Sequence, residues 1–219
     1  MTATLLQLSP QSSPTDADLH DLRFRALLGG VAWDALPREV RRRFSKRLSG
    51  TDVALYRGLV VEMRVSRLGS LLAQFCRLFG APLPLNPRPG HGAIVSVSED
   101  SRSGGQCWTR MYARPGRFPQ VIHSAKRFAG STGLEEYLGH GLGMALRAEA
   151  LSDGIAFVSD HYFLQLGRRR IRLPRILAPG TTRVTHRQIA GSSFLFGLEL
   201  IHPLAGVLIH QQILFDDVD

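Results

Sequence analysis

The row of side chains on one predicted strand is well suited to bind a polar ligand. Over residues 105–113, strand alternation places Gln106, Trp108, Arg110 and Tyr112 on one face. An arginine between two aromatic rings can bind an anionic or carbonyl group while the rings pack against an apolar body. The alternative is an exterior row in which the guanidinium stacks on its neighbours. We predict that the row lines a concave face of the sheet.

Arg110 would need a partner in that position. A guanidinium removed from water is costly unless a carboxylate or a ligand pairs with it. Glu62 and Glu199 are the candidate partners on the predicted strands, and an anionic ligand is the alternative. The opposite face of the same strand, with Cys107 and Met111, would then pack outward beneath a helix.

The eight histidines form no metal-binding motif such as H-E-x-x-H, so we predict no metal site. His161 is in phase with Phe157 and Phe163 on one predicted strand, and His186 lies on another. We expect both histidines in core or rim positions. An enzyme that uses His161, His186 or Glu199 inside the concavity is the alternative, because imidazole and carboxylate groups can transfer protons.

Two segments resemble catalytic or phosphate-binding loops only in composition. Ser152-Asp153-Gly154 has the residues of a hairpin turn. The glycine-rich segment 139–143 lacks a following helix whose N-terminus could hold a phosphate, and no G-x-S-x-G motif supplies a serine nucleophile. We therefore expect no nucleotide fingerprint, no serine hydrolase and no cofactor.

Two arginine-rich clusters are the main source of positive charge. They are Arg38, Arg41, Arg42, Arg43, Lys46 and Arg47, followed by Arg168, Arg169, Arg170, Arg172 and Arg175. Neither cluster is interleaved with aromatic residues that could stack on bases, so the sequence carries no specific nucleic-acid signal. A solvated face is the expected role, and a surface interaction module that contacts acidic partners is the alternative.

The elements that must position these residues are mostly strands. Apolar spacing predicts helices at about 15–28, 36–48 and 68–79. Alternation and turn residues predict strands at 53–65, 92–99, 105–113, 117–126, 141–150, 154–166, 181–189, 192–202 and 206–215. Their connections are too short for crossover helices, so the strands must pair antiparallel.

These elements predict an α+β, mainly β fold. About nine antiparallel strands should curl into a barrel or half-barrel, a lipocalin-like cup, with two or three short helices. The helix at 36–48 should lie outside the sheet through Val40, Phe44 and Leu48, with its arginines in solvent. If 203–206 is the last turn, Glu199 should face His210 and His202 should face Val207.

Composition describes an ordinary globular chain. Its 219 residues are 44% hydrophobic, and 27 Lys and Arg against 18 Asp and Glu give a formal charge of +9. Two distant cysteines and the lack of a secretory signal favour the cytoplasm, and no apolar run is long enough for a transmembrane helix. We expect residues 1–15 to be a disordered leader and residues 16–219 to form a single β-rich domain.

A set of short motifs resembles a known family. The motifs are Leu28-Gly29, Trp33, Leu36-Pro37, Val40-Arg41, Leu78-Phe79-Gly80-Ala81-Pro82, Trp108-Thr109-Arg110-Met111-Tyr112, Leu173-Pro174 and Pro203-Leu204-Ala205-Gly206. In this order, over residues 24–215, the chain resembles the bacterial domain-of-unknown-function family 4166. The family pattern has an acidic residue where this chain has Gln106. The resemblance implies a β-rich domain, which stands alone or follows a reductase-type partner domain, and no established activity.

These observations lead to a functional hypothesis. We expect a non-catalytic domain that binds a small apolar, amphipathic or anionic ligand inside the cupped sheet. The candidate ligand-binding residues are Trp108, Arg110, Tyr112, His161, His186 and Glu199.

Overall fold

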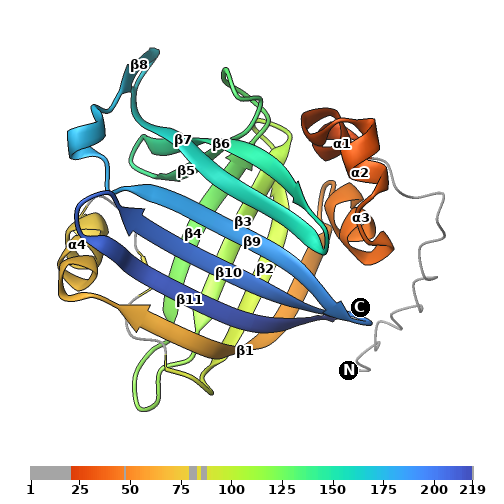
Figure 1. Ribbon diagram of the computed structural model, residues 1–219, viewed down its shortest axis with the longest axis horizontal. Coiled ribbons are helices and arrows are strands. Elements are labelled where there is room, and N and C mark those ends of the chain that lie inside the picture. The colour runs from red at the N-terminus through yellow and green to blue at the C-terminus, as the bar shows by residue number, and fades with distance from the viewer. Residues whose placement is uncertain (1–20, 47, 79–82, 85–87, 219) are drawn as a thin grey trace, which may run out of the picture.

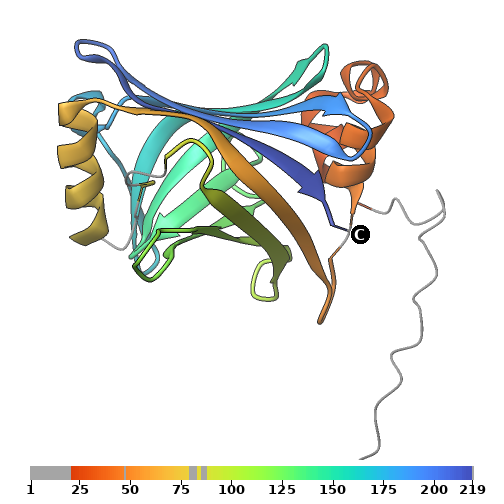
Figure 2. The same ribbon diagram turned by 90° about the horizontal axis from the view of Figure 1, so that it is seen from below.

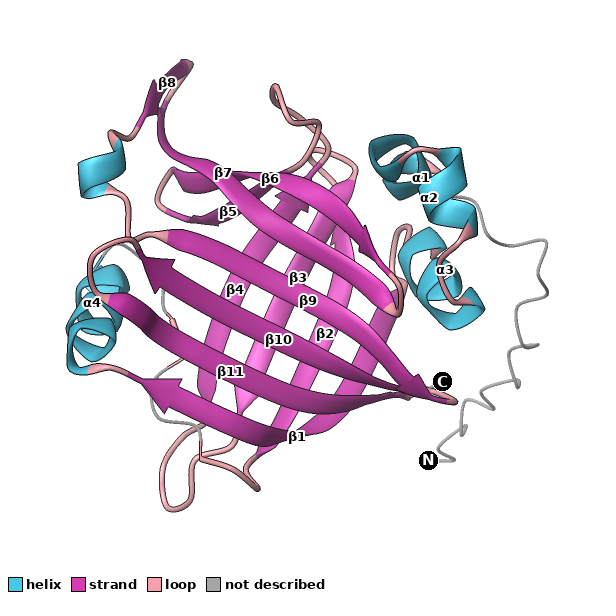
Figure 3. Cartoon of the chain, in the orientation of Figure 1, coloured by secondary structure: helices cyan, strands magenta, loops and turns pink. Residues whose placement is uncertain are grey.

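Strands dominate the computed structural model, which describes residues 21–46, 48–78, 83–84 and 88–218 (Figure 3). The described elements are α1 (Arg23–Leu28), α2 (Gly30–Asp34), α3 (Arg38–Ser45), β1 (Val53–Val65), α4 (Arg67–Leu78), β2 (Gly92–Asp100), β3 (Gly105–Tyr112), β4 (Gln120–Arg127), β5 (Glu135–Gly139), β6 (Leu142–Leu151), β7 (Gly154–Leu166), β8 (Arg169–Arg172), the 3₁₀ turn η2 (Arg175–Leu177), β9 (Thr181–Ala190), β10 (Ser193–His202) and β11 (Gly206–Asp217). The predicted leader, 1–15, lies outside the described residues.

Ten of the described strands form a closed antiparallel barrel (Figure 1). Strands β1 to β7 pair in sequence order, β9 pairs with β7, and β9, β10 and β11 then return to β1. The pairing of β6 with β7 closes the ring, so the fold is a barrel rather than a half-barrel. Closure leaves no unpaired strand edge in the ring. Strand β8 forms a hairpin with β7 outside it.

The nine predicted strands are all present, with small shifts at their ends, but β5 and β8 were not predicted. Strand β5 is five residues long and ends at Gly139. A segment this short gives too few alternations for recognition from sequence alone. The described helices also exceed the expected two or three, because α2 begins at Gly30, where the first predicted helix should end.

Helices close the two ends of the barrel (Figures 1 and 2). Helices α1 to α3 lie at one end, where Phe24 and Phe44 pack edge to face with ring centroids 5.1 Å apart. Phe44 also reaches Phe157 of β7, at 5.8 Å. This end of the interior is therefore filled by aromatic side chains.

The prediction that the basic helix lies on the outside of the sheet is wrong for α3. Val40 and Phe44 are buried, as expected, but they face the open end of the barrel and not its outer wall. Arg43 follows them inward. Its guanidinium lies 3.9 Å from the Phe194 ring centroid and donates to Gln188 at 3.2 Å, and burial lowers its pKa. A substitution at Arg43 is consequently a core substitution and not a surface one.

Helix α4 also differs from its expected place. The sequence suggested that its apolar stripe covers the convex face behind Cys107 and Met111, whereas α4 lies across the second end of the barrel (Figure 2). It packs on β11 through Gly69, where a Cβ atom would collide with the carbonyl oxygen of Leu208. Among the described residues, no helix is long and apolar enough to cross a membrane.

The last hairpin matches its predicted register over most of its length. Glu199 faces His210, and the His210 Nδ1 lies 3.0 Å from a Glu199 carboxylate oxygen. Beyond Leu200 the register shifts, so that His202 pairs with Gly206 instead of the predicted Val207. A bulge of one residue causes the shift, and simple alternation cannot anticipate it.

Candidate ligand-binding site

A cavity of about 490 Å³ occupies the α4 half of the barrel. It lies within the usual size range of small-molecule sites, about 300–1,000 Å³. Its walls are mainly apolar and come from strands on both sides of the barrel and from α4. Representative lining residues are Leu72, Phe75, Ile122, Met144, Leu198 and Leu200.

The row on β3 points into the barrel. Arg110 and Tyr112 line the cavity, and Trp108 lies deeper, where it is buried against the aromatic end. The Tyr112 hydroxyl donates to Gln211 at 3.2 Å. The Trp108 indole donates to the side-chain oxygen of Gln106 at 3.3 Å, so Gln106 serves as an acceptor for the ring.

A network of three charged side chains lies at the floor of the cavity: Arg110 and Glu136 line it, and Lys126 pairs with Glu136 behind them. The Arg110 Nη2 atom lies 3.1 Å from one oxygen of Glu136, and the Lys126 ammonium lies 3.2 Å from the other. The same Arg110 nitrogen donates to Ser124 at 3.1 Å. The predicted partners Glu62 and Glu199 are therefore incorrect, because the carboxylate that meets Arg110 belongs to β5.

The network holds Glu136 as a carboxylate. Burial alone would raise its pKa, but Lys126, Arg110 and hydrogen bonds from Ser124 and Lys126 lower that pKa to about 2. Burial lowers the pKa of Lys126, an effect that Glu136 opposes. The Lys126 ammonium also lies 4.6 Å from the Trp108 ring centroid, a further contact that favours its charged form.

Arg110 keeps unused hydrogen-bonding capacity. Its contacts with Ser124 and Glu136 both use Nη2, and its buried Nε has no hydrogen-bond partner among the described residues. With Lys126 protonated, two cations face one carboxylate, which leaves one positive charge in excess. A partly satisfied guanidinium of this kind can accept a carboxylate or another anionic group.

His186 faces the interior but lies beneath the cavity, in an aromatic shell. Its ring is 5.3 Å from Phe44, 5.8 Å from Phe194 and 5.3 Å from Phe196, centroid to centroid. Neither ring nitrogen has a hydrogen-bond partner among the described residues. Burial and the nearby cations Lys126, Arg43 and Arg110 lower its pKa well below the ordinary histidine value. The imidazole is therefore neutral.

We expect His186→Leu to stabilise the protein by about 1–2 kcal/mol at pH 7, because it removes two unsatisfied polar atoms from an apolar shell. Below about pH 6.5 the unfolded chain binds a proton at this position and the folded chain does not. As the pH is lowered below about 6.5, this group should therefore reduce the folding stability by about 1.4 kcal/mol per pH unit. The His186→Leu variant should lack that loss.

Chemical denaturation between pH 5 and pH 8 measures both effects of His186→Leu. His123→Leu, at an exposed histidine, should change stability by only about 0.5 kcal/mol. Destabilisation by His186→Leu at pH 7 would show that the imidazole has a favourable polar partner.

His161 and Glu199 do not line the cavity. His161 contacts the Asp160 carboxylate at 2.8 Å, and Glu199 contacts His210 near a second carboxylate, Glu62. The register of β6 with β7 shifts beside Asp160, and beyond it Tyr162 lines the cavity. The predicted phase of His161 with Phe157 is lost at this irregularity. His161, His186 and Glu199 therefore do not share one pocket.

Sequence reasoning missed Glu136 and Lys126. Lys126 and Glu136 are direct partners in the β4–β5 ladder. Lys126 is in phase with Ile122 on a predicted strand, which would have marked it as inward-facing. A hairpin that begins near Glu136 could have been predicted from the turn residues that precede the strand at 141–150, which are Gly139-His140-Gly141.

Comparison with known proteins supports the family resemblance and adds no activity. A family model described as domain of unknown function (DUF4166) matches residues 36–215. No curated protein and no solved structure matches the chain. The match spans most of the chain, including nine barrel strands in full, β11 up to Phe215, α4 and the cavity lining. The chain thus belongs to the DUF4166 family of domains of unknown function.

Proposed function

We propose that this protein binds an amphipathic small molecule that carries an anionic head. The apolar body would occupy the cavity beneath α4, and the head would meet Arg110 at the floor. The observation that carries the proposal is that two basic side chains, Arg110 and Lys126, share the single carboxylate of Glu136 at the base of an apolar cavity, so that a positive charge is in excess when Lys126 is protonated. Burial of that charge is costly without an anion and becomes favourable when an anion pairs with it.

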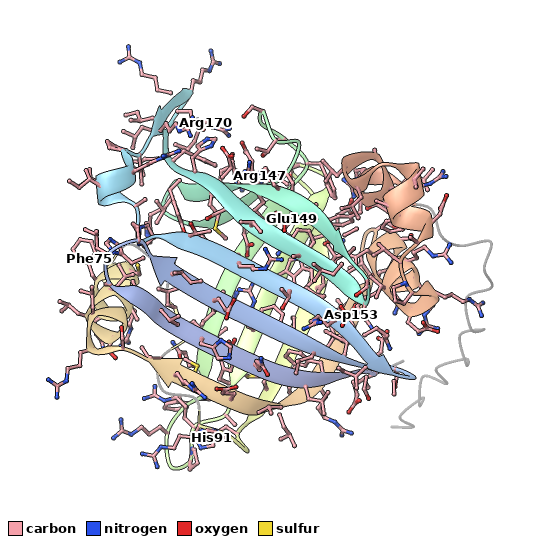
Figure 4. All side chains as sticks on the ribbon, viewed as in Figure 1. Phe75, His91, Arg147, Glu149, Asp153 and Arg170 are labelled. Atoms are coloured by element: carbon pink, nitrogen blue, oxygen red, sulfur yellow. The ribbon has the colours of Figure 1, made fainter. Side chains whose placement is uncertain are left out.

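The mouth of the cavity supports entry of a long molecule. Leu72, Phe75 and Cys76 of α4 contribute to its wall, and Leu173, just before η2, and Leu177, the last residue of η2, lie on the lining as well. The Phe75 side chain lies at the α4 end of the barrel in Figure 4. An apolar tail could therefore extend from the charged floor toward this end.

We favour binding over catalysis because the three acid–base residues that the sequence suggested lie apart. His161 and Glu199 do not line the cavity, and His186 is packed among aromatic rings below it. Proton transfer requires a group within hydrogen-bond reach of the reacting atom, and none of these three meets that condition for a ligand in the cavity.

Native mass spectrometry of the protein purified from its own host tests the proposal. We expect a retained molecule of fixed mass, with both an apolar portion and an acidic group. Leu198→Trp, which places an indole in the cavity, should abolish retention. Leu195→Trp on the same strand provides the matched control, because residue 195 is on the opposite face and is absent from the lining.

Both variants should remain folded, as judged by circular dichroism and a cooperative thermal transition. Equal retention by Leu198→Trp and the native protein would contradict the cavity assignment. A retained molecule without an acidic group would contradict the role given to Arg110.

A further inference from the structure

The end of the barrel at which the cavity opens also exposes apolar side chains on three separate elements. Leu71 on α4 is 67% exposed, Ile176 on η2 is 89% exposed and Leu204 in the β10–β11 turn is 92% exposed. Leu68 of α4 is also exposed. A large apolar side chain in water has no stabilising role in the isolated protein, and several at one end indicate a surface that contacts an apolar phase.

These elements are neighbours at the rim of the cavity. Ser66, just before α4, donates its backbone N–H to Leu208 at the start of β11, beside the β10–β11 turn. Gly180, just after η2, approaches the Ile201 carbonyl at the end of β10. In Figure 1, α4, the β10–β11 turn and the segment before β9 lie together at the left end of the barrel.

Helix α4 has the pattern of a helix that lies on a membrane surface. Over its twelve residues, Leu72, Phe75 and Cys76 line the cavity. Leu68, Leu71 and the exposed part of Phe75 continue the apolar face onto the outer surface. Arg67 and Arg77 are also exposed. Helices of this kind bury their apolar side among lipid chains while basic side chains contact the headgroups.

The charge of this end is positive, and only part of it is paired with acidic side chains. Segments 66–78 and 167–180 contain arginines but no Asp or Glu, and the turn at 202–206 contains no acidic residue. Arg170 pairs with Glu135, and Arg172 lies 4.0 Å from Asp160. Among the residues that the structure describes, Arg67, Arg77, Arg168, Arg169 and Arg175 have no acidic partner. Figure 4 labels Arg170 at β8, whose guanidinium contacts Glu135 and lies 4.2 Å from the Phe163 ring centroid.

The opposite end of the barrel has a different character. Acidic side chains are present there on α2, on α3 and at the end of β11, and the last of these, Asp217, pairs with Arg42 and Lys46. Part of the basic cluster on α3 is thus neutralised by Asp217, whereas Arg67, Arg77, Arg168, Arg169 and Arg175 at the cavity end have no acidic partner among the described residues. These arginines would attract an anionic surface to the cavity end.

We propose that the cavity end docks on an anionic lipid bilayer, with Leu71, Ile176 and Leu204 inserted among the lipids and the unpaired arginines at the headgroups. The proposal goes beyond ligand binding, because it concerns the outer surface. When the protein is docked, the mouth of the cavity would face the acyl region of the bilayer. An amphipathic ligand could then pass from the bilayer into the cavity without crossing water.

Sedimentation of the full chain with vesicles tests the docking surface. We expect binding to vesicles of phosphatidylcholine mixed with phosphatidylglycerol, and much weaker binding to phosphatidylcholine alone. The double variant Arg67→Gln, Arg77→Gln should weaken binding by about fivefold per arginine. A rise from 0.1 M to 1 M salt shortens the screening length from about 10 Å to 3 Å and should release much of the protein.

The apolar contribution has its own variants. Leu71→Gln combined with Ile176→Gln should weaken binding by about tenfold or more. Val31→Gln is the matched control, because Val31 is 90% exposed but lies on α2 at the opposite end. Leu198→Trp should still bind the vesicles, so a failure of the cavity proposal is distinguishable from a failure of docking.

Three results would overturn the proposal. One is equal binding to neutral and anionic vesicles, or no binding to either kind of vesicle. Another is an equal loss of binding in Val31→Gln and in the α4–η2 double variant. The third is binding to a short single-stranded DNA without binding to vesicles, which would assign the basic end to a nucleic-acid partner.

Discussion

Glu136→Gln should destabilise the folded protein by about 3–5 kcal/mol at neutral pH. The substitution removes the carboxylate that faces both Arg110 and Lys126 while the two cations stay inside the barrel. Loss of one partner from a buried ionic cluster leaves uncompensated charge, and this costs far more than the loss of a surface pair. Chemical denaturation at pH 7 measures the change.

A second substitution isolates the cause. Lys126→Met in the Glu136→Gln background should restore most of the lost stability, because it removes one of the two buried positive charges that no longer have a carboxylate partner. Glu149→Gln is the control, since Glu149 is 45% exposed and pairs with Arg183 on the surface; we expect a change of about 0.5 kcal/mol or less. Purely additive effects in the double variant would contradict the network.

The same carboxylate predicts an acid-sensitive stability. The pKa of Glu136 is about 2 in the folded protein, below its ordinary value of 4.5. Its stabilising contribution is therefore complete above about pH 4.5 and is lost as the pH falls toward 2. The total is about 3 kcal/mol, and Glu136→Gln should lack this part of the acid dependence.

Arg110→Met should selectively weaken the binding of anionic amphiphiles. The substitution removes the guanidinium that lines the cavity and whose Nε has no hydrogen-bond partner among the described residues, and Glu136 and Lys126 remain paired. We expect a loss of about 2–4 kcal/mol for a long-chain fatty acid, roughly 30- to 1,000-fold in Kd, and little change for the alcohol of the same chain length.

Isothermal titration with both probes makes the comparison, and Arg64→Met is the control. Arg64 has a side chain that is 80% exposed and pairs with Glu62, so this variant should bind both probes as the native protein does. Equal weakening of acid and alcohol by Arg110→Met would mean that Arg110 only shapes the cavity. No weakening of either would place the head group elsewhere.

Local sequence pattern was sufficient for much of this protein. Alternation identified β1 at 53–65 with its observed bounds and placed Trp108, Arg110 and Tyr112 on one face of β3. It also predicted the Glu199–His210 pair in the last hairpin. These features depend on side-chain period and turn length. Both are determined by a few neighbouring residues, so they can be predicted from the local sequence.

Register irregularities mark the first limit of that inference. The shift between β6 and β7 beside Asp160 separates His161 from the inward phase of Phe157, and the shift after Leu200 changes the partner of His202. A bulge adds one residue to a strand and reverses which face the following side chains occupy. Its position depends on how the neighbouring strand pairs, so alternation along one strand does not reveal it.

The composition of the site shows the second limit. Sequence pattern identified the aromatic and arginine row on β3, but only the closed sheet brings Glu136 from β5, two strands away, to Arg110. Closure also decides that α3 and α4 cover the ends of the barrel, which buries Arg43 and leaves Leu71 exposed. Pairings between distant strands, and the choice of which surface a helix covers, are set by the shape of the whole barrel rather than by residue period.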